Sequence, residues 1–418
     1  MNILTLLIFF SSTLFSIITP MAKELSIALT LDSEKDVSTI NSIFLMVAAI
    51  SSIFWALSGD KISRKVLLII ATFEWSTMAL LTIFAFNFKT LLMFQILTAI
   101  GFGAALPLVY SLTVDFIEPE KRGKNFGLLS AVYVLGNGFG QVLSGFLIDM
   151  YLWQAPLIIV SIGGYICTSL LFLVHEPYRG KSDKLFQQSD NVQEIMYYKI
   201  HLKDINKIGK IKSTVWILIL NFVMFIAIGS ISSFFISMLK NDYSLSSTLA
   251  TIFLIIVFGS QIPSGPIFGK IGDNIRKKDV NGRIKVVVGC LSFGSILYII
   301  GFSLFLLSNS FILALIFLIF AFSAAFLFGG IDPLIQATLG EVNPPQIRST
   351  IYSINFLAYS FGRSISLILL GEFFLIFNNN YSPGYIILSI LALSSSLFII
   401  PIFKNVPKDI ERIKLGVL

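Results

Sequence analysis

Four ionisable side chains, those of Glu74, Asp332, Arg363 and Glu372, lie inside long apolar runs of the sequence. A charge inside a bilayer is costly, so each of them is a candidate for binding an ion or a solute. Asp332 and Arg363 occupy consecutive runs, and we expect them to pair, either in a solute path or as a structural contact. Proton transfer through Asp332 or Glu372 is a further hypothesis, whereas Glu74 is expected to serve packing or folding.

Uncharged polar residues in the apolar runs complete the candidate solute path. The first half of the chain offers mainly neutral groups, and the second half adds the charges of Asp332 and Arg363. Such an asymmetric cavity would suit an amphipathic solute. The neutral set comprises Gln95, Tyr110, Ser111, Asn137 and Gln141 in the first half and Gln261, Gln336, Asn355 and Tyr359 in the second.

The sequence lacks the residue patterns that metal binding, nucleotide binding and nucleophilic catalysis require. The two histidines, His175 and His201, do not have metal-ligand spacing, and no Gly-x-x-x-x-Gly-Lys-Ser/Thr sequence is present to hold a nucleotide. No histidine within the apolar runs could activate a serine nucleophile. Cys167 and Cys290 lie in apolar runs and are interpreted as packing residues. We therefore expect no enzyme activity, no metal and no cofactor.

The composition indicates a membrane protein. Of 418 residues, 56% are hydrophobic and 13% are charged, and the mean hydropathy is +0.86; soluble domains carry about 25% charged residues. Twelve apolar runs are long enough to cross a bilayer, and an isolated backbone in lipid must be helical. The first run lacks a basic leader and a cleavage site, so it is expected to be a retained helix. The runs are 3–22, 37–57, 66–86, 89–114, 126–148, 155–175, 214–238, 246–268, 285–307, 311–336, 349–376 and 383–403.

The net charge is +7, and the distribution of the basic residues along the chain indicates membrane topology rather than nucleic-acid binding. With both termini in the cytoplasm, 25 of the 30 Lys and Arg residues fall in inner loops and the C-terminal tail, and only 4 fall outside. This distribution follows the positive-inside rule. It predicts a multi-pass protein of the cell membrane.

An internal repeat organises the chain. A shift of 226 positions places Phe102–Gly145 on Phe328–Gly371 with nine identities, and Asp115 meets Glu341. Chance alignment of two apolar helix pairs is the alternative to an ancient duplication. The repeat predicts an N-terminal six-helix bundle at 1–175, a cytoplasmic linker at 176–213, a C-terminal bundle at 214–403 and a cytoplasmic tail at 404–418. Within the linker, Ile195–Ile208 is either an amphipathic helix on the inner leaflet or a solvated segment. The identical pairs are Phe102/Phe328, Gly103/Gly329, Pro107/Pro333, Leu108/Leu334, Pro119/Pro345, Arg122/Arg348, Tyr133/Tyr359, Gly136/Gly362 and Gly145/Gly371.

Two short loops carry a resemblance to a known family. The loop after the second run reads Gly59-Asp60-Lys61-Ile62-Ser63-Arg64-Lys65, and the corresponding loop of the second half reads Gly272-Asp273-Asn274-Ile275-Arg276-Lys277. This pattern resembles the loop-2/3 motif of the major facilitator superfamily, and with twelve runs the match covers nearly the whole chain. The resemblance implies an all-α membrane protein of twelve transmembrane helices in two pseudo-symmetric six-helix bundles. It also implies a monomeric symporter or antiporter that moves a small molecule by alternating access; a sensor of the same fold without transport is the alternative.

The resemblance further implies a cytoplasmic latch made by loop acids and arginines. Each helix-end acid is expected to pair with the arginine seven residues later, Asp115 with Arg122 and Glu341 with Arg348. Such a pair, exposed in one state, is worth about 0–1 kcal/mol and could break in every cycle. The latch residues would be Asp60, Arg64, Asp115 and Arg122 in the first half and Asp273, Arg276, Glu341 and Arg348 in the second.

Glycines predict seams at which helices move. The fifth run contains Gly136-Asn137-Gly138-Phe139-Gly140, and the eighth contains Gly259, Pro263, Gly265, Pro266 and Gly269. In the superfamily these two helices face each other. We interpret both as moving contacts rather than ligand sites.

Two local features bear on the subfamily. Gln95 occupies the region where many proton-coupled members have a buried arginine in the fourth helix, which puts the common proton-linked arginine mechanism in doubt. The segment Glu176-Pro177-Tyr178-Arg179-Gly180 is similar to that of Spinster-type members, which move sphingolipids or lysophospholipids. Those members also carry charges in the first helix, and this chain has none there before Lys23.

Overall fold

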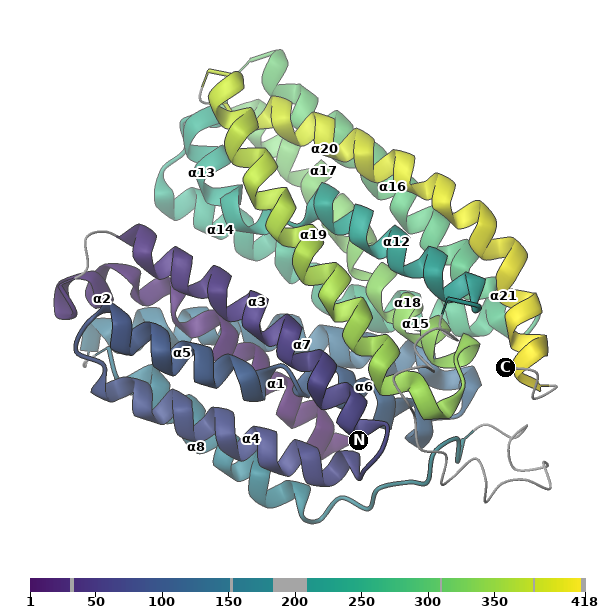
Figure 1. The fold of residues 1–418 in the computed structure, drawn as a ribbon. Coiled ribbons are helices and arrows are strands. Elements are labelled where there is room, and N and C mark those ends of the chain that lie inside the picture. The colour runs from purple at the N-terminus through teal and green to yellow at the C-terminus, as the bar shows by residue number, and fades with distance from the viewer. Residues whose placement is uncertain (31–33, 151–152, 183–208, 309, 379, 415–418) are drawn as a thin grey trace. The chain divides into compact units, whose positions relative to one another are not determined.

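The computed structural model describes residues 1–30, 34–150, 153–182, 209–308, 310–378 and 380–414, and the regular elements in these ranges are helices (Figure 1). Within these described ranges, eleven helical spans are long and apolar enough to cross a membrane. A twelfth apolar helix, α8 (Ala155–Leu171), has 17 residues. These twelve segments coincide with the twelve predicted runs, which confirms the fold class.

The elements follow the order of the runs. The first half comprises α1 (Asn2–Ile17), η1 (Thr19–Met21), α2 (Ala22–Ala28), α3 (Glu34–Gly59), α4 (Arg64–Leu81), η2 (Thr82–Phe84), α5 (Phe88–Phe102), α6 (Ala105–Phe116), η3 (Pro119–Lys121), α7 (Arg122–Met150) and α8. The second half comprises α12 (Lys212–Ile228), α13 (Ile231–Tyr243), α14 (Ser247–Gly259), α15 (Gln261–Arg276), α16 (Gly282–Ser303), η5 (Leu304–Leu306), α17 (Phe311–Gly329), α18 (Ile331–Val342), η6 (Pro345–Ile347), α19 (Arg348–Ile376), α20 (Ser382–Ser395), η7 (Ser396–Phe398) and α21 (Ile399–Lys414).

The bounds of these elements repeat along the chain. α6, η3 and α7 begin and end 226 positions before α18, η6 and α19, which is the shift found in the sequence. The interruption between α5 and α6 at Gly103 and Ala104 likewise corresponds to the one between α17 and α18 at Gly330. Small residues at these points allow close packing: a Cβ added to Gly103 would lie 2.2 Å from the Ser51 hydroxyl oxygen, and one added to Gly330 would lie 2.5 Å from the Phe268 ring.

The described chain divides into two compact units. Unit 1 contains Met1–Glu118, Val132–Lys203 and Pro344–Leu357, and unit 2 contains Pro119–Ala131, Asp204–Asn343 and Ala358–Leu418. Each unit therefore includes the first turns of a long helix, α19 or α7, that the sequence assigns to the other half.

Unit 1 is held by close helix packing. α4 packs against α5 and α8, and Trp75 of α4 is buried against Gly164 of α8, where an added Cβ would lie 2.5 Å from the indole ring. Gly163 similarly receives the ring of Phe10 from α1. These glycines allow bulky rings to fill the space between helices.

Unit 2 is organised around α16, which packs against α17 and α20. Its centre is a set of stacked rings: Phe302 lies 4.8 Å from Tyr385 and 5.4 Å from Phe317, measured between ring centroids. α21 continues the last span, with Val406, Ile410 and Ile413 buried. The predicted tail at 404–418 is thus helical as far as Lys414, whereas the predicted amphipathic segment Ile195–Ile208 lies outside the described residues.

Candidate functional site

A buried carboxylate in unit 1 caps the start of α19. Asp60, which follows α3, accepts hydrogen bonds from the backbone N–H groups of Ser349 (3.1 Å) and Thr350 (2.9 Å) and from the Thr350 hydroxyl. These N–H groups have no partner within their own helix, and the amino end of a helix favours negative charge. Burial raises the pKa of Asp60 to about 6, although the hydrogen bonds from Thr350 oppose this shift.

A second acid in unit 1 joins two buried arginines. Asp115, near the end of α6, lies 2.6 Å from Arg64 of α4 and 3.1 Å from Arg348 of α19. The side chains of all three residues are at most 2% exposed. A buried charge is tolerated only with close partners, so this cluster fixes three helices at one end of the unit.

The segment after α8 binds the same cluster. Glu176 accepts hydrogen bonds from Ser63 and from the backbone N–H of Arg64 and contacts its guanidinium at 3.1 Å, while the Gly180 N–H donates to Asp115. Arg179 donates to the carbonyl oxygens of Gly59 (2.7 Å) and Asp60 at the end of α3. We call residues 176–182 the strap, because they bind the end of α3, the start of α4 and the end of α6.

The surroundings of the strap shift the pKa values of its two charged side chains, Glu176 and Arg179. Burial favours a higher pKa for Glu176, but the hydrogen bond from Ser63 and the charge of Arg64 outweigh it and lower that pKa below its ordinary value. Burial and the nearby charge of Arg64 lower the pKa of the Arg179 guanidinium. Glu176 is therefore held as the carboxylate that the start of α4 requires.

Unit 2 repeats the arrangement of unit 1. Asp273 of α15 accepts hydrogen bonds at 2.9 Å from the backbone N–H groups of Gly123 and Lys124, at the start of α7. Arg283 of α16 joins Asp273 and Glu341, each at 2.8 Å, and Arg276 also pairs with Glu341.

The structure changes the expected pairings. Glu341 binds Arg276 and Arg283, and Asp115 binds Arg64 and Arg348, so the predicted pairs Asp115–Arg122 and Glu341–Arg348 are wrong. Arg122 is buried and donates to the carbonyl oxygen of Gly340 in unit 2. The interpretation of exposed, weak pairs fails because the acids reach across helices instead of along the chain.

Arg283 is a site residue that the sequence reasoning missed. It is the second residue of α16, as Arg64 is the first residue of α4, and the two arginines make equivalent contacts to Glu341 and Asp115. The loop between α15 and α16 is longer than the loop between α3 and α4. Counting from the acid in each loop therefore matched Arg276, instead of Arg283, with Arg64. Aligning the starts of the two helices, rather than the loops, would have found Arg283.

A glycine seam joins α7 to α15 in unit 2. A Cβ added to Gly127 would lie 2.2 Å from the carbonyl oxygen of Gly265, and one added to Gly269 would lie 2.2 Å from that of Gly123. Two small residues four positions apart on each helix thus permit backbone contact. The predicted seam residues Gly265 and Gly269 lie in this contact, whereas a Cβ added to Gly136 or Gly140 would meet α1.

The candidate solute residues of unit 2 form two separate groups. Asp332 of α18 accepts hydrogen bonds from Ser130 (3.2 Å) and Gln336 (2.8 Å). Arg363 of α19 donates to the hydroxyl groups of Tyr359 (3.0 Å) and Ser233 (3.4 Å). The predicted Asp332–Arg363 ion pair is therefore wrong for this structure, because Asp332 is bound by the Ser130 hydroxyl and the Gln336 amide.

The other predicted path residues differ in exposure. Gln95 is buried and donates to Thr82 at the end of the neighbouring span, which is a packing contact within unit 1. Tyr110 packs edge-to-face on Tyr352 with 5.6 Å between ring centroids. Asn137, Gln141, Gln261 and Glu372 are partly exposed or exposed, whereas Ser111 and Asn355 are buried. Glu74 is partly exposed and lies against Gly101 of α5, where an added Cβ would overlap its carboxylate.

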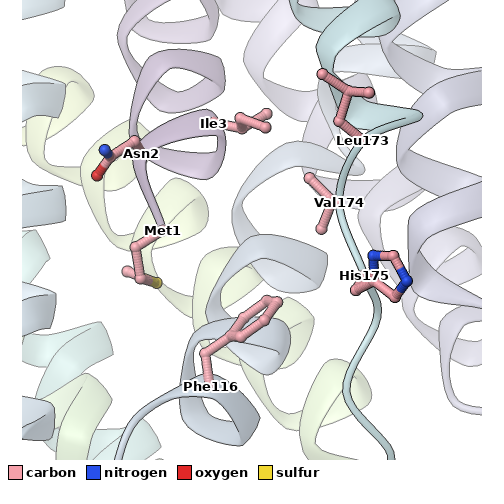
Figure 2. A pocket seen from close by; sticks show the side chains of 7 residues that line it. All are labelled: Met1, Asn2, Ile3, Phe116, Leu173, Val174 and His175. Carbon is pink, nitrogen blue, oxygen red and sulfur yellow. The ribbon is translucent and has the colours of Figure 1, made fainter.

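A shallow hollow of about 430 Å³ lies at one end of unit 1 (Figure 2). Ile3, Phe116, Leu173 and Val174 line it, and the side chains of Asn2 and His175 supply its polar groups. It contains none of the predicted path residues. Among the residues that the structure describes, no group of three His, Cys, Asp or Glu side chains could hold a metal ion.

Comparison with known proteins agrees with this architecture. The family model of the Major Facilitator Superfamily matches residues 3–294. The putative niacin/nicotinamide transporter NiaP of Bacillus subtilis is 26% identical over 32% of this chain, and the match spans 33% of NiaP. The multidrug resistance protein MdtG of Proteus mirabilis is 26% identical over 75% of this chain and 73% of its own.

A solved structure shares the fold. The proton:xylose symporter XylE, bound to 6-bromo-6-deoxy-D-glucose, superposes with a TM-score of 0.72 at 16% identity, over 95% of this chain and 94% of its own. Three features of this chain agree with these matches: two helix-capping acids at equivalent places, a repeat at a shift of 226 residues and twelve apolar spans. The chain belongs to the major facilitator superfamily of membrane transport proteins.

Proposed function

We propose that this protein is a secondary transporter that moves a small organic or amphipathic solute across the cell membrane by alternating access. The observation that carries the proposal is the pair of capped helix starts. Asp60 binds the start of α19 in unit 1, and Asp273 binds the start of α7 in unit 2. Each acid thereby holds the start of a helix that belongs to the other sequence half. Breaking both caps would free the two halves to move at this end.

The charge distribution favours a cytoplasmic position for these caps. The basic loops at Lys61–Lys65 and Lys270–Lys285 adjoin Asp60 and Asp273, and positive loops remain on the inner side during insertion. In the proposed cycle, this structure is the state whose cytoplasmic end is latched. Both termini and the linker at 176–213 then lie in the cytoplasm.

Proton coupling is the energy source we propose. Asp332 lies in a membrane span, and one of its hydrogen bonds comes from Ser130, which is in the first sequence half but belongs to unit 2. Movement of α7 would remove this donor and leave the carboxylate with Gln336. A proton would then replace the lost hydrogen bond. Uptake that is indifferent to collapse of the pH gradient would exclude this part of the proposal.

The names of the relatives support a small organic solute without identifying it. NiaP is named for niacin and nicotinamide, MdtG for multidrug resistance and XylE for xylose. The strap resembles the Spinster segment, which supports a lysolipid or sphingolipid as the second candidate class. A sensor that binds solute without moving it is the other alternative.

The test is solute flux in proteoliposomes containing the purified protein. A thermal-shift screen against sugars, organic acids, drugs and lysolipids first selects a ligand, because a ligand of the native state raises the melting temperature. We expect flux of that ligand with the wild type and strongly reduced flux with Asp60→Asn. The matched control is Asp409→Asn, since Asp409 is also buried and caps α12 through Ser213, within one half.

The outcomes separate the alternatives. Binding without flux would identify a sensor. Wild-type flux through folded Asp60→Asn would contradict the latch, and equal loss of flux in Asp409→Asn would show that any lost cap suffices.

A further inference from the structure

One face of α21 is fixed to the rest of unit 2. Val406, Ile410 and Ile413 on this face are buried, and α21 lies beside α12 (Figure 1). Asp409 accepts hydrogen bonds from the backbone N–H of Ser213 (2.8 Å) and from its hydroxyl (2.7 Å), at the start of α12. Because this face is held, the direction of the opposite face of α21 is held as well.

A second contact holds α21 near its middle. Pro407 lies inside the helix and has no N–H, so the carbonyl oxygen of Phe403 lacks its usual helical partner. Asn281, at the start of α16, donates to that oxygen at 3.1 Å. The helix therefore remains attached to unit 2 beyond the end of the last apolar span.

The opposite face of α21 carries a row of basic residues. Ile400 is 67% exposed, and the exposed side chains of Lys404 and Lys408 follow at intervals of four residues, on the same side of the helix. The last span starts at Ser382, and about 20 residues at 1.5 Å each cross the hydrocarbon core, which therefore ends close to Ile400. The two lysines lie about 6 Å and 12 Å further along, within side-chain reach of a headgroup layer about 5–8 Å thick.

The start of α12 adds a third lysine and an aromatic pair to this surface. Lys212 is exposed and directly precedes Ser213, so the bond between Ser213 and Asp409 brings it to the level of Lys408. One turn further into the span, Trp216 stacks on the last ring of η7 with 6.0 Å between ring centroids. Tryptophan is enriched where the hydrocarbon core meets the headgroups, which agrees with the depth derived from the length of the last span.

Basic side chains outnumber acidic ones on this surface. Arg412 continues the row of α21 and pairs with Asp409, which is buried, at 3.7 Å. Glu411 is the exposed acid of the same turn. The three lysines lie closer to the membrane than this acid, so the surface next to the membrane is positive.

We propose that Lys404, Lys408 and Lys212 bind the headgroups of anionic phospholipids, with Trp216 against the upper part of an acyl chain. Ammonium groups bind phosphate, and basic clusters next to a membrane span are attracted to anionic lipid. A lipid fits better than a soluble partner, because the row continues directly from the lipid-facing Ile400. The bound lipid would join the seventh and the twelfth spans. The inference takes the inner leaflet from the proposed orientation and does not rest on solute transport.

The test measures the quenching of Trp216 by lipids with brominated acyl chains, in nanodiscs that contain the purified full chain. One mixture has brominated phosphatidylglycerol in phosphatidylcholine, and the other has the bromine on phosphatidylcholine instead. The chain has four tryptophans, so the signal of Trp216→Phe is subtracted. We expect phosphatidylglycerol to be enriched beside Trp216. Lys404→Gln combined with Lys408→Gln should weaken this preference about fivefold for each charge removed.

Two further double variants separate this surface from basic charge in general. Lys61→Gln combined with Lys270→Gln removes the same charge from exposed lysines outside α12 and α21, and should leave the preference unchanged. Lys404→Arg combined with Lys408→Arg keeps the charge and should keep the preference. The melting temperature in phosphatidylcholine alone shows that each variant is folded.

Three results would overturn the lipid surface: equal quenching by the two brominated lipids in the wild type, a preference that survives the loss of Lys404 and Lys408, or an equal loss in the variant of Lys61 and Lys270. Equal quenching together with binding of an acidic protein would assign the row to that partner instead. Flux is measured separately in proteoliposomes. A lipid preference without flux would contradict only the transport proposal, and flux without a lipid preference would contradict only the lipid surface.

Discussion

At the scale of single residues, the recurring device is a distant carboxylate that caps a helix. Among the residues that the structure describes, five acids do this, and each accepts at least one backbone N–H group at the start of a helix that lies far away in the sequence. Asp60 and Asp273 each cap a helix of the other sequence half, whereas the other three acids each cap a helix of their own half. The five are Asp60, Glu176, Asp242, Asp273 and Asp409.

Asp60→Asn should flatten the pH dependence of stability. The raised pKa of about 6 means that this conformation binds a proton more tightly than one in which Asp60 is exposed. Stability is therefore favoured below pH 6, and it falls as the pH rises from the ordinary value near 4 through 6. The apparent melting temperature of the wild type should drop between pH 5 and pH 7 relative to Asp60→Asn. Parallel profiles for the two proteins would contradict the assignment.

Asp115→Asn should destabilise the protein by about 3–5 kcal/mol, because it leaves Arg64 and Arg348 buried with one counter-charge fewer. Asp279→Asn is the control. Its partner Lys285 is largely exposed, so the loss should be about 0–1 kcal/mol. Chemical unfolding followed by tryptophan fluorescence measures both changes, and equal effects would show that burial of the cluster is unimportant.

At the scale of elements, two features determine how helices meet: the strap and the glycine seam. The strap binds the end of α3 and the start of α4 with opposite charges, Arg179 and Glu176, as the helix dipoles require. The seam lets α7 and α15 approach to backbone contact. Both act through backbone groups, so neither appears as a hydrophobic pattern.

Gly127→Ala should destabilise the seam, whereas Gly138→Ala should not. Both glycines lie in α7, but the added methyl group would meet the Gly265 carbonyl in the first case and open space in the second. Overpacking costs about 1–3 kcal/mol, while alanine is favoured over glycine within a helix by up to about 1 kcal/mol. Thermal unfolding in one detergent compares the pair. Equal melting temperatures would argue that the helices separate freely at this point.

Gly180→Ala tests the strap. Gly180 has φ near 75°, a left-handed conformation that alanine adopts only with strain, and its N–H donates to Asp115. We expect a loss of about 1–3 kcal/mol. Gly145→Ala, where an added Cβ meets nothing within 4 Å, should be close to neutral by the same unfolding assay.

At the scale of the whole molecule, the sequence allowed the number of spans, their repeat and the fold to be predicted. The apolar runs have the length of membrane spans, and the two halves of the sequence align at a shift of 226 residues. Asp60 and Asp273 could also be identified as site residues, because each directly follows a glycine, Gly59 or Gly272, in one of the two similar loops. The partners of Asp115 and Glu341 were not, because burial selects neighbours across helices instead of along them. Asp409 gave no signal, since its partner Ser213 is 196 positions away.

The membrane orientation can be checked with two single cysteines. Lys61→Cys, on the exposed basic loop, should react with a membrane-impermeant maleimide only after the cells are opened. Phe86→Cys, 72% exposed between η2 and α5, should react in intact cells. Cys167 and Cys290 are buried and should react little, so the background is low. The opposite pattern would invert the proposed topology.

The division of α19 between the compact units has a consequence for split versions of the protein. A fragment ending before the linker would retain Asp60 and Asp115 but lack residues 344–357, which supply the backbone N–H groups and the arginine that these acids bind. Its partner fragment would in turn lack the start of α7, which Asp273 caps. Each fragment made alone should therefore be short-lived in the cell, and co-expression of the two should restore both.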